Sequence, residues 1–153
     1  MMLFLMRHGD AVHSAPSDAE RVLSAAGRQE VLAAAGRLRE SEPGIQRILS
    51  SPYARARQTA ELVSEVLGVA PVESCDWVTP DNEPGETARR LGQLLAGCPS
   101  ALVVTHQPII SRLIMYLTDT GVPMGTASIA WLNTLEAPMP VFEMGCSELI
   151  CLI

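Results

Sequence analysis

The run LFLMRHGD at residues 3–10 decides the fold of this chain. Its first four residues are apolar without alternation, which is typical of a strand covered on both faces. Arg7 and His8 follow at once, although the interior of a sheet tolerates charge poorly. The run ALVVTHQPI at residues 101–109 repeats the arrangement, with an apolar strand that ends at His106. Because each of these two strands is followed by a histidine at its carboxyl end, the sequence predicts that the two histidines share one site.

Length, composition and charge limit the class of protein. With 153 residues, 48% hydrophobic and 18% charged, we expect one globular domain over residues 1–153. The net charge of −6 disfavours a nucleic-acid partner. The apolar start is too short for a signal peptide and no apolar run approaches the roughly 20 residues of a membrane span, so we expect a cytoplasmic protein without a membrane partner. The four cysteines form no CxxC pair, which predicts small buried side chains and not disulfides or a zinc site.

Strands and helices alternate along most of the chain. Apolar runs predict strands at residues 2–7, 45–51, 70–74 and 101–105. Composition and spacing predict helices at residues 25–40, 53–68, 86–97 and 107–119. Ser24 is the expected N-cap of the first helix, and Pro52 suits the first turn of the second. Further strand patterns close the chain at residues 126–134, 139–144 and 147–152.

This alternation predicts an α/β fold, in which helices cover both faces of a mainly parallel sheet and the closing strands add antiparallel pairing. In such sheets ligands bind outside the carboxyl ends of the strands. Four polar residues are expected at those ends: Arg7, His8, Ser51 and His106. We therefore expect these side chains to lie together.

The segment SSPYARARQTA at residues 50–60 carries two arginines. Arg55 is expected in the first turn of a helix, where free backbone N–H groups and the helix dipole favour an anion. Arg57 lies about 200° around the helix and is expected to point to solvent. Arg55 shares its face with Gln58 and Thr59.

Two arginines, two imidazoles and two helix amino termini would receive a doubly charged oxyanion, of which phosphate is the commonest. Neutral His8 could attack phosphorus and hold the phosphoryl group until water removes it, while the arginines and a protonated His106 offset its charge. Gly9 would let the backbone approach the substrate or free a carbonyl to orient the His8 ring. The third histidine, His13, does not supply the ligand set of a catalytic zinc, and the arginines would repel a cation. We therefore expect no metal and no cofactor.

Three segments together resemble a known family. MRHGD at residues 6–10 resembles the RHG signature of the histidine phosphatase superfamily, the clan that includes the phosphoglycerate mutases. SSPYARARQTA is similar to its S-P-x-x-R-A-x-Q-T segment, and VVTHQP at residues 103–108 to the strand with its second histidine. The resemblance implies a phosphoglycerate mutase-like three-layer α/β/α sandwich and a phosphohistidine intermediate on His8. It also implies a phosphate pocket completed by Arg7, Arg55 and His106.

Two further segments bear on the substrate. ERVLSAAG at residues 20–27 resembles the R-x-L-T/S-x-x-G segment of the family, which implies that Arg21 contacts phosphate or substrate. Most relatives carry a carboxyl group after the third strand that protonates the departing oxygen. The corresponding loop here offers three candidates without a local motif to choose among them: Asp81, Glu83 and Glu86. An alkoxide leaving group needs such an acid, whereas an imidazole, with a pKa near 6.5, needs less help.

By its length and its MRHGDA segment the chain is similar to the SixA-type branch of the superfamily, the phosphohistidine phosphatases. The leading hypothesis is therefore a signal-transduction enzyme that dephosphorylates phosphohistidine on a protein, such as a histidine-phosphotransfer domain or a phosphocarrier. The alternative is a phosphatase of small phosphate monoesters that uses the same His8 nucleophile and a loop carboxylate as general acid. A third hypothesis, a module that binds phosphohistidine without hydrolysing it, is disfavoured by the full set of histidines and arginines.

Overall fold

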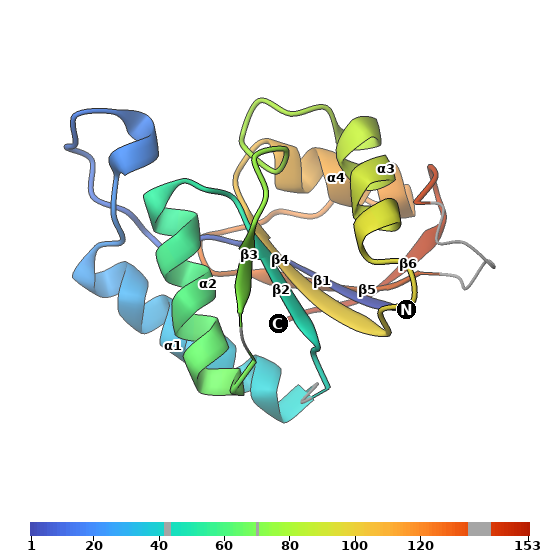
Figure 1. Cartoon of the computed structure of the whole chain (residues 1–153), viewed down its shortest axis with the longest axis horizontal. Helices are drawn as coiled ribbons and strands as arrows, with labels where there is room; N and C mark the ends of the chain where they lie inside the picture. Colours follow the sequence, from blue (N-terminus) through green and yellow to red (C-terminus); the bar gives the residue numbers. More distant parts are fainter. Residues whose placement is uncertain (42–43, 70, 135–141) are drawn as a thin grey trace.

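A six-stranded sheet organises the molecule in a computed structural model that describes residues 1–41, 44–69, 71–134 and 142–153 (Figure 1). The strands lie in the order β3-β2-β4-β1-β5-β6. Their bounds are β1 Met2–Arg7, β2 Arg47–Ser50, β3 Val72–Ser74, β4 Ser100–Thr105, β5 Ile129–Thr134 and β6 Ser147–Leu152. The first four strands pair in parallel, and β5 and β6 add antiparallel pairs beside β1. The expected mainly parallel sheet is confirmed.

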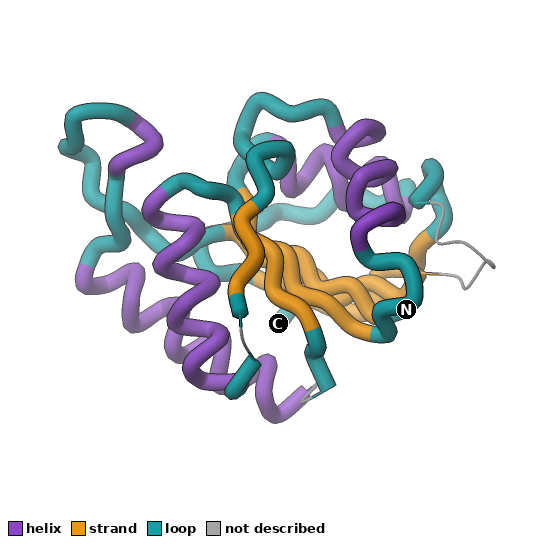
Figure 2. Tube along the Cα trace, viewed as in Figure 1, coloured by secondary structure: helices purple, strands orange, loops and turns teal. Residues whose placement is uncertain are grey.

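Helices cover both faces of this sheet (Figure 2). Their bounds are η1 Asp18–Glu20, α1 Ala25–Ser41, α2 Ala54–Leu67, α3 Pro84–Leu94 and α4 Ile109–Thr118. α1 and α2 lie on one face of the sheet, and α3 and α4 lie on the other (Figure 1). The three-layer α/β/α arrangement is thereby confirmed. No helix in the described ranges has the length and apolar character needed to cross a membrane.

The apolar run of β1 explains its central place. Leu3 and Leu5 pack in the hydrophobic cluster that includes α3 and α4, whereas Phe4 and Met6 pack in the cluster that includes α1 and α2. All four side chains are fully buried. Successive residues of a strand point to opposite faces, so only a continuous apolar run can fill both layers.

The ends of two helices test the expected caps. Ser24 Oγ accepts a hydrogen bond from the backbone N–H of Gly27 at 3.0 Å, which confirms Ser24 as the N-cap of α1. Pro52 lies outside the first turn of α2, because the helix begins at Ala54. Tyr53 keeps an extended backbone with ψ at 137°, so the helical turn starts one residue after it. The helix expected from residue 53 therefore begins one residue later, and Pro52 does not lie in its first turn.

Further differences lie in the polar loop after β1, in the closing segment and at the cysteines. The 3-10 helix η1 was not predicted, because its residues carry no apolar period. For the strand expected at residues 139–144, residues 139–141 lie outside the described residues, and Phe142–Met144 form no strand. The four cysteines are free thiols, but only Cys75 is buried as expected: Cys98 and Cys146 are half-buried and Cys151 is exposed.

Candidate active site

The carboxyl ends of three neighbouring strands bring the expected side chains together. His8 follows β1, Ser51 follows β2 and His106 follows β4. The ring centroids of His8 and His106 are 5.0 Å apart, and His106 Nε2 lies 2.7 Å from Ser51 Oγ. The grouping expected from sequence is therefore present at this edge of the sheet.

Both ring nitrogens of His8 have a hydrogen-bond partner. Its Nδ1 lies 2.7 Å from the carbonyl oxygen of Gly9, and Arg55 Nε donates to its Nε2 at 3.1 Å. These contacts place the ring proton on Nδ1 and the lone pair on Nε2. The pKa of His8 is lowered to about 4, mainly by burial and also by the charges of Arg55, Arg7 and Arg21, against the opposing effect of the Gly9 hydrogen bond. His8 is thus neutral at pH 7, the state a nucleophile requires.

Arg55 is the most extensively bonded cation of the site. Its side chain is buried, with Nη1 donating to the backbone carbonyl of Asp18 at 2.7 Å and Nη2 to Asp18 Oδ2 at 3.1 Å. The guanidinium also stands over the ring of Tyr53, 5.2 Å from its centroid. Arg55 is therefore fixed from three sides with its Nε directed at His8.

Asp18 is a site residue that sequence reasoning missed. Besides its contacts with Arg55, its carboxylate accepts a hydrogen bond from Arg21 Nη1 at 3.0 Å. Arg21 in turn donates its Nε to the carbonyl of Val12 at 2.7 Å. Arg21, expected from the family resemblance, thus joins the network through Asp18. The hydrogen bonds from Arg21 and Arg55 lower the pKa of Asp18, so this group is a carboxylate at pH 7.

Arg7 and His106 present buried donors from adjacent strand ends. Arg7 pairs in register with Thr105, the residue before His106. Arg7 Nη1 donates to the carbonyl of Met124 at 2.9 Å, while Arg7 Nε and His106 Nδ1 are buried without a hydrogen-bond partner among the described residues. Buried polar groups are nearly always paired, so two unpaired nitrogens on residues from adjacent strand ends suit an anionic ligand.

The protonation of His106 differs from the expectation. The pKa of His106 is lowered to about 3, mainly by burial and also by the charges of His8, Arg55 and Arg7, against an opposing effect of Asp18. The ring is only 1% exposed. His106 is therefore neutral at pH 7 in the unliganded site, because burial disfavours the charged ring and it would add a third cation beside two guanidinium groups.

The backbone at Gly9 has room for no side chain. A Cβ there would lie 2.7 Å from both the carbonyl oxygen of Gly27 and the Cγ2 of Val31. The Gly9 N–H donates to Thr59 Oγ1 at 3.2 Å. Gly9 therefore lets the loop after β1 lie against α1 while its carbonyl orients His8.

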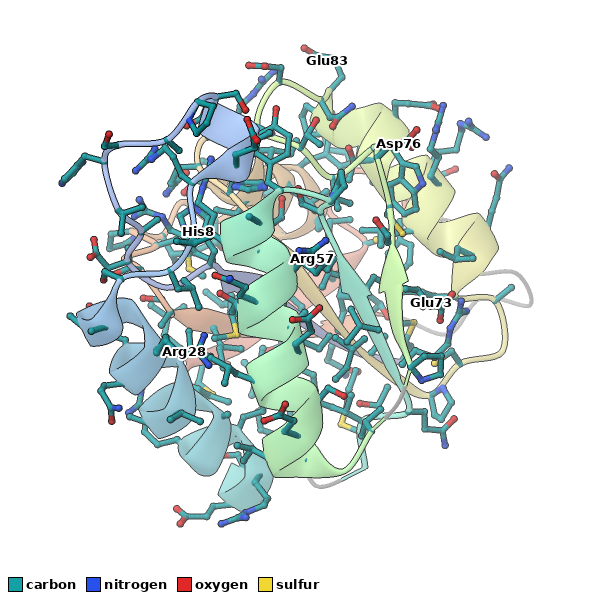
Figure 3. All side chains as sticks on the ribbon, turned by 60° about the vertical axis from the view of Figure 1, so that its left-hand side comes forward. His8, Arg28, Arg57, Glu73, Asp76 and Glu83 are labelled. Carbon is teal, nitrogen blue, oxygen red and sulfur yellow. The ribbon has the colours of Figure 1, made fainter. Side chains whose placement is uncertain are left out.

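The predicted division of the α2 face is confirmed. Thr59 contacts Gly9, and Gln58 Oε1 accepts a hydrogen bond from the Leu23 N–H at 2.8 Å. Arg57 lies on the exposed side, 3.6 Å from Glu61 (Figure 3).

The three loop carboxylates are all exposed. Glu83 is at the outer edge of the molecule, whereas His8 lies near the start of α2 (Figure 3). The Glu83 side chain is 75% exposed and is 3.1 Å from Arg112. Glu86 bonds to Arg89 and Arg90, whose hydrogen bonds lower its pKa to about 2, and Asp81 is exposed. No described contact joins these three residues to His8, and their role as acid stays a prediction.

The low pKa of His8 has a direct experimental consequence. We expect the His8 ring to stay neutral as the pH falls from 7 and to titrate at about pH 4 instead of the usual 6.5. The pKa of His8 is lowered and not raised, because burial and the nearby cations both disfavour the imidazolium form. An NMR titration of the imidazole signals, with the His8 signal assigned from its absence in His8→Asn, measures this midpoint. A midpoint near 6.5 would contradict the buried, cation-flanked geometry.

Comparison with known proteins agrees with this geometry. The model of the histidine phosphatase superfamily, branch 1, matches residues 3–77. The chain is 35% identical over 139 residues to the phosphohistidine phosphatase SixA of Escherichia coli K12, which covers 89% of this chain and 86% of that protein. It is also 29% identical over 143 residues to the phosphohistidine phosphatase SixA homologue of Haemophilus influenzae. This alignment covers 86% of this chain and 87% of that protein. Among solved structures, the protein histidine phosphatase SixA complexed with tungstate superposes with a TM-score of 0.87 at 30% identity, covering 100% of this chain and 96% of that one.

Proposed function

This chain belongs to branch 1 of the histidine phosphatase superfamily and is a SixA-like phosphatase, and we propose that its substrate is phosphohistidine on a protein. One observation carries the proposal: among the described residues, the neutral nucleophile His8 has no contact with a carboxyl group that could act as an acid. In the described part of the chain, the carboxyl group joined to the His8 network is that of Asp18, which two arginines hold ionised. An imidazole leaving group needs less acid assistance than an alkoxide.

The proposed reaction has two steps at phosphorus. In the first, His8 Nε2 forms a bond to phosphorus as the bond between phosphorus and the substrate imidazole breaks. The substrate ring carries a proton on its other nitrogen and therefore departs as neutral imidazole. In the second, water attacks the phosphoryl group on His8, which releases inorganic phosphate and restores the neutral ring. Arg55, Arg7 and His106 donate hydrogen bonds to the phosphoryl oxygens in both steps.

The kind of substrate follows from the same chemistry. A histidine-phosphotransfer domain or a phosphocarrier carries its phosphoryl group on an imidazole, which is the leaving group that this site can release without an acid. The names of the two SixA relatives give phosphohistidine phosphatase as their activity, and tungstate in the related structure is a tetrahedral oxyanion like phosphate. Both facts support the proposal.

A competition between two substrates tests it. We expect phosphate release from a phosphohistidine-bearing transfer domain to be about 100-fold or more faster than from a sugar phosphate, because general acid catalysis typically contributes about 10²–10⁴-fold and an ester needs it. The rates are measured as label lost from each substrate at equal concentration.

The loop variants Glu83→Gln and Glu86→Gln serve as matched controls. We expect both to hydrolyse phosphohistidine at the wild-type rate, since their side chains are exposed and paired with arginines. The proposal is overturned if the wild type hydrolyses the sugar phosphate faster than phosphohistidine and one of these variants loses that activity. Such a result would favour the monoester phosphatase.

A further inference from the structure

The hydrogen bond between Ser51 and His106 is linked to the tautomer of the His106 ring, because its direction shows which ring nitrogen carries the proton. Ser51 is fully buried directly after β2, and its Oγ lies 2.7 Å from His106 Nε2. The same oxygen accepts a hydrogen bond from the Tyr53 N–H at 3.3 Å. The His106 ring lies between Tyr53 and His8, with a centroid separation of 5.0 Å to each. The ring is therefore fixed on both sides, and Nε2 is already occupied.

Only one assignment of protons satisfies these groups. If the Ser51 hydroxyl donates to His106 Nε2, the single proton of the neutral ring is on Nδ1, and the hydroxyl oxygen is free to accept from Tyr53. In the reverse assignment Nε2–H donates to Ser51, so the buried hydroxyl hydrogen has no acceptor among the described residues. His106 Nδ1 would then present a lone pair, which repels the oxygen of an anion. The first assignment leaves one unused donor, Nδ1–H.

We propose that Ser51 is a positioning residue that fixes His106 as the Nδ1–H tautomer, so that Nδ1 donates a hydrogen bond to the phosphoryl group at His8. The inference rests on the proposed function, since it places a phosphoryl group beside His8. The tautomer matters because the ring is neutral at pH 7: a protonated ring would carry hydrogen on both nitrogens and would need no such control.

The neighbouring serine provides a matched control. Ser50 is also buried and is the last residue of β2, but its Oγ donates to the carbonyl oxygen of Ser51 and has no described contact with His106. Ser50→Ala and Ser51→Ala thus each remove one buried hydroxyl from the same place in the fold. A purely structural role of these hydroxyls would give both variants the same phenotype.

Two measurements on wild type, Ser50→Ala and Ser51→Ala test the inference. The nitrogen chemical shifts of His106 report the tautomer, and we expect Nδ1–H in wild type and Ser50→Ala but a mixture or Nε2–H in Ser51→Ala. Tungstate, a phosphate-like oxyanion, should bind about 10-fold to 100-fold more weakly to Ser51→Ala alone, the usual effect of losing one hydrogen bond to a charged group. The inference is overturned if Ser51→Ala keeps the Nδ1–H pattern or matches Ser50→Ala in tungstate affinity.

The same experiment separates this inference from the proposed function. If the wild type hydrolyses phosphohistidine but Ser51→Ala keeps the Nδ1–H tautomer, the proposed role of Ser51 is wrong and the proposed function still stands. If Ser51→Ala changes the tautomer and weakens tungstate binding but the wild type does not hydrolyse phosphohistidine, the proposed function is wrong and the role of Ser51 still stands.

Discussion

Replacement of His8 by asparagine is expected to lower kcat/KM for phosphohistidine by about 10³-fold or more, the largest effect of any single change in this chain. Asparagine keeps a polar side chain of similar reach but has no ring nitrogen with a lone pair to attack phosphorus. The donors of Arg7, Arg55 and His106 remain in place, so affinity for tungstate should change far less than turnover. Steady-state kinetics and tungstate binding on the same preparation measure the two quantities.

His13 provides the matched control for this change. It is an exposed histidine in the loop that follows the same strand. We expect His13→Asn to hydrolyse phosphohistidine at the wild-type rate. Base-quenched samples should carry label on the wild type and on His13→Asn but none on His8→Asn, because a phosphoryl group on imidazole survives base. Retention of more than about a tenth of the activity by His8→Asn would contradict the assignment of His8 as nucleophile.

The sequence predicted best what local patterns determine. The strand at residues 2–7 has the same bounds in the structure, because a continuous apolar run between polar loops permits little else. Arg55 is buried and Arg57 is exposed, as helical spacing predicted, since two residues differ by about 200° around a helix. The meeting of His8 and His106 followed from the rule that parallel strands end at one edge.

Contacts between distant segments could not be predicted in this way. Asp18 reaches Arg55 across 37 positions of sequence from a polar loop without periodicity, so no local signal marked it. The neutral state of His106 depends on burial and on charges from other elements, which become known only when the fold places them. The helix expected from residue 53 begins at Ala54, since Tyr53 keeps an extended backbone and donates its N–H to Ser51 Oγ outside the helix.

Replacement of Gly27 by alanine is expected to destabilise the fold by about 3 kcal/mol, the largest stability change we predict. A Cβ at Gly27 would lie 2.0 Å from the carbonyl oxygen of Asp10 and 2.8 Å from its backbone nitrogen. These are main-chain atoms of the loop that carries His8, so no side chain can move aside to relieve the clash. That loop is also tied to α1, since Ser24 Oγ donates to Asp10 Oδ2 at 2.6 Å and the Asp10 N–H donates to Glu30 Oε2 at 3.1 Å.

Gly36 lies in the same helix, so Gly36→Ala is a control that shows the general effect of replacing glycine by alanine without this clash. A Cβ at Gly36 would meet no atom within 4 Å, so Gly36→Ala should stabilise the protein by up to about 1 kcal/mol through its better helix propensity. Urea unfolding of the two variants measures both changes against wild type. Because the Gly27 clash displaces the loop after β1, Gly27→Ala should also bind tungstate more weakly, whereas Gly36→Ala should bind it normally. Equal stabilisation of the two variants would show that the close approach of α1 to the His8 loop does not constrain the fold.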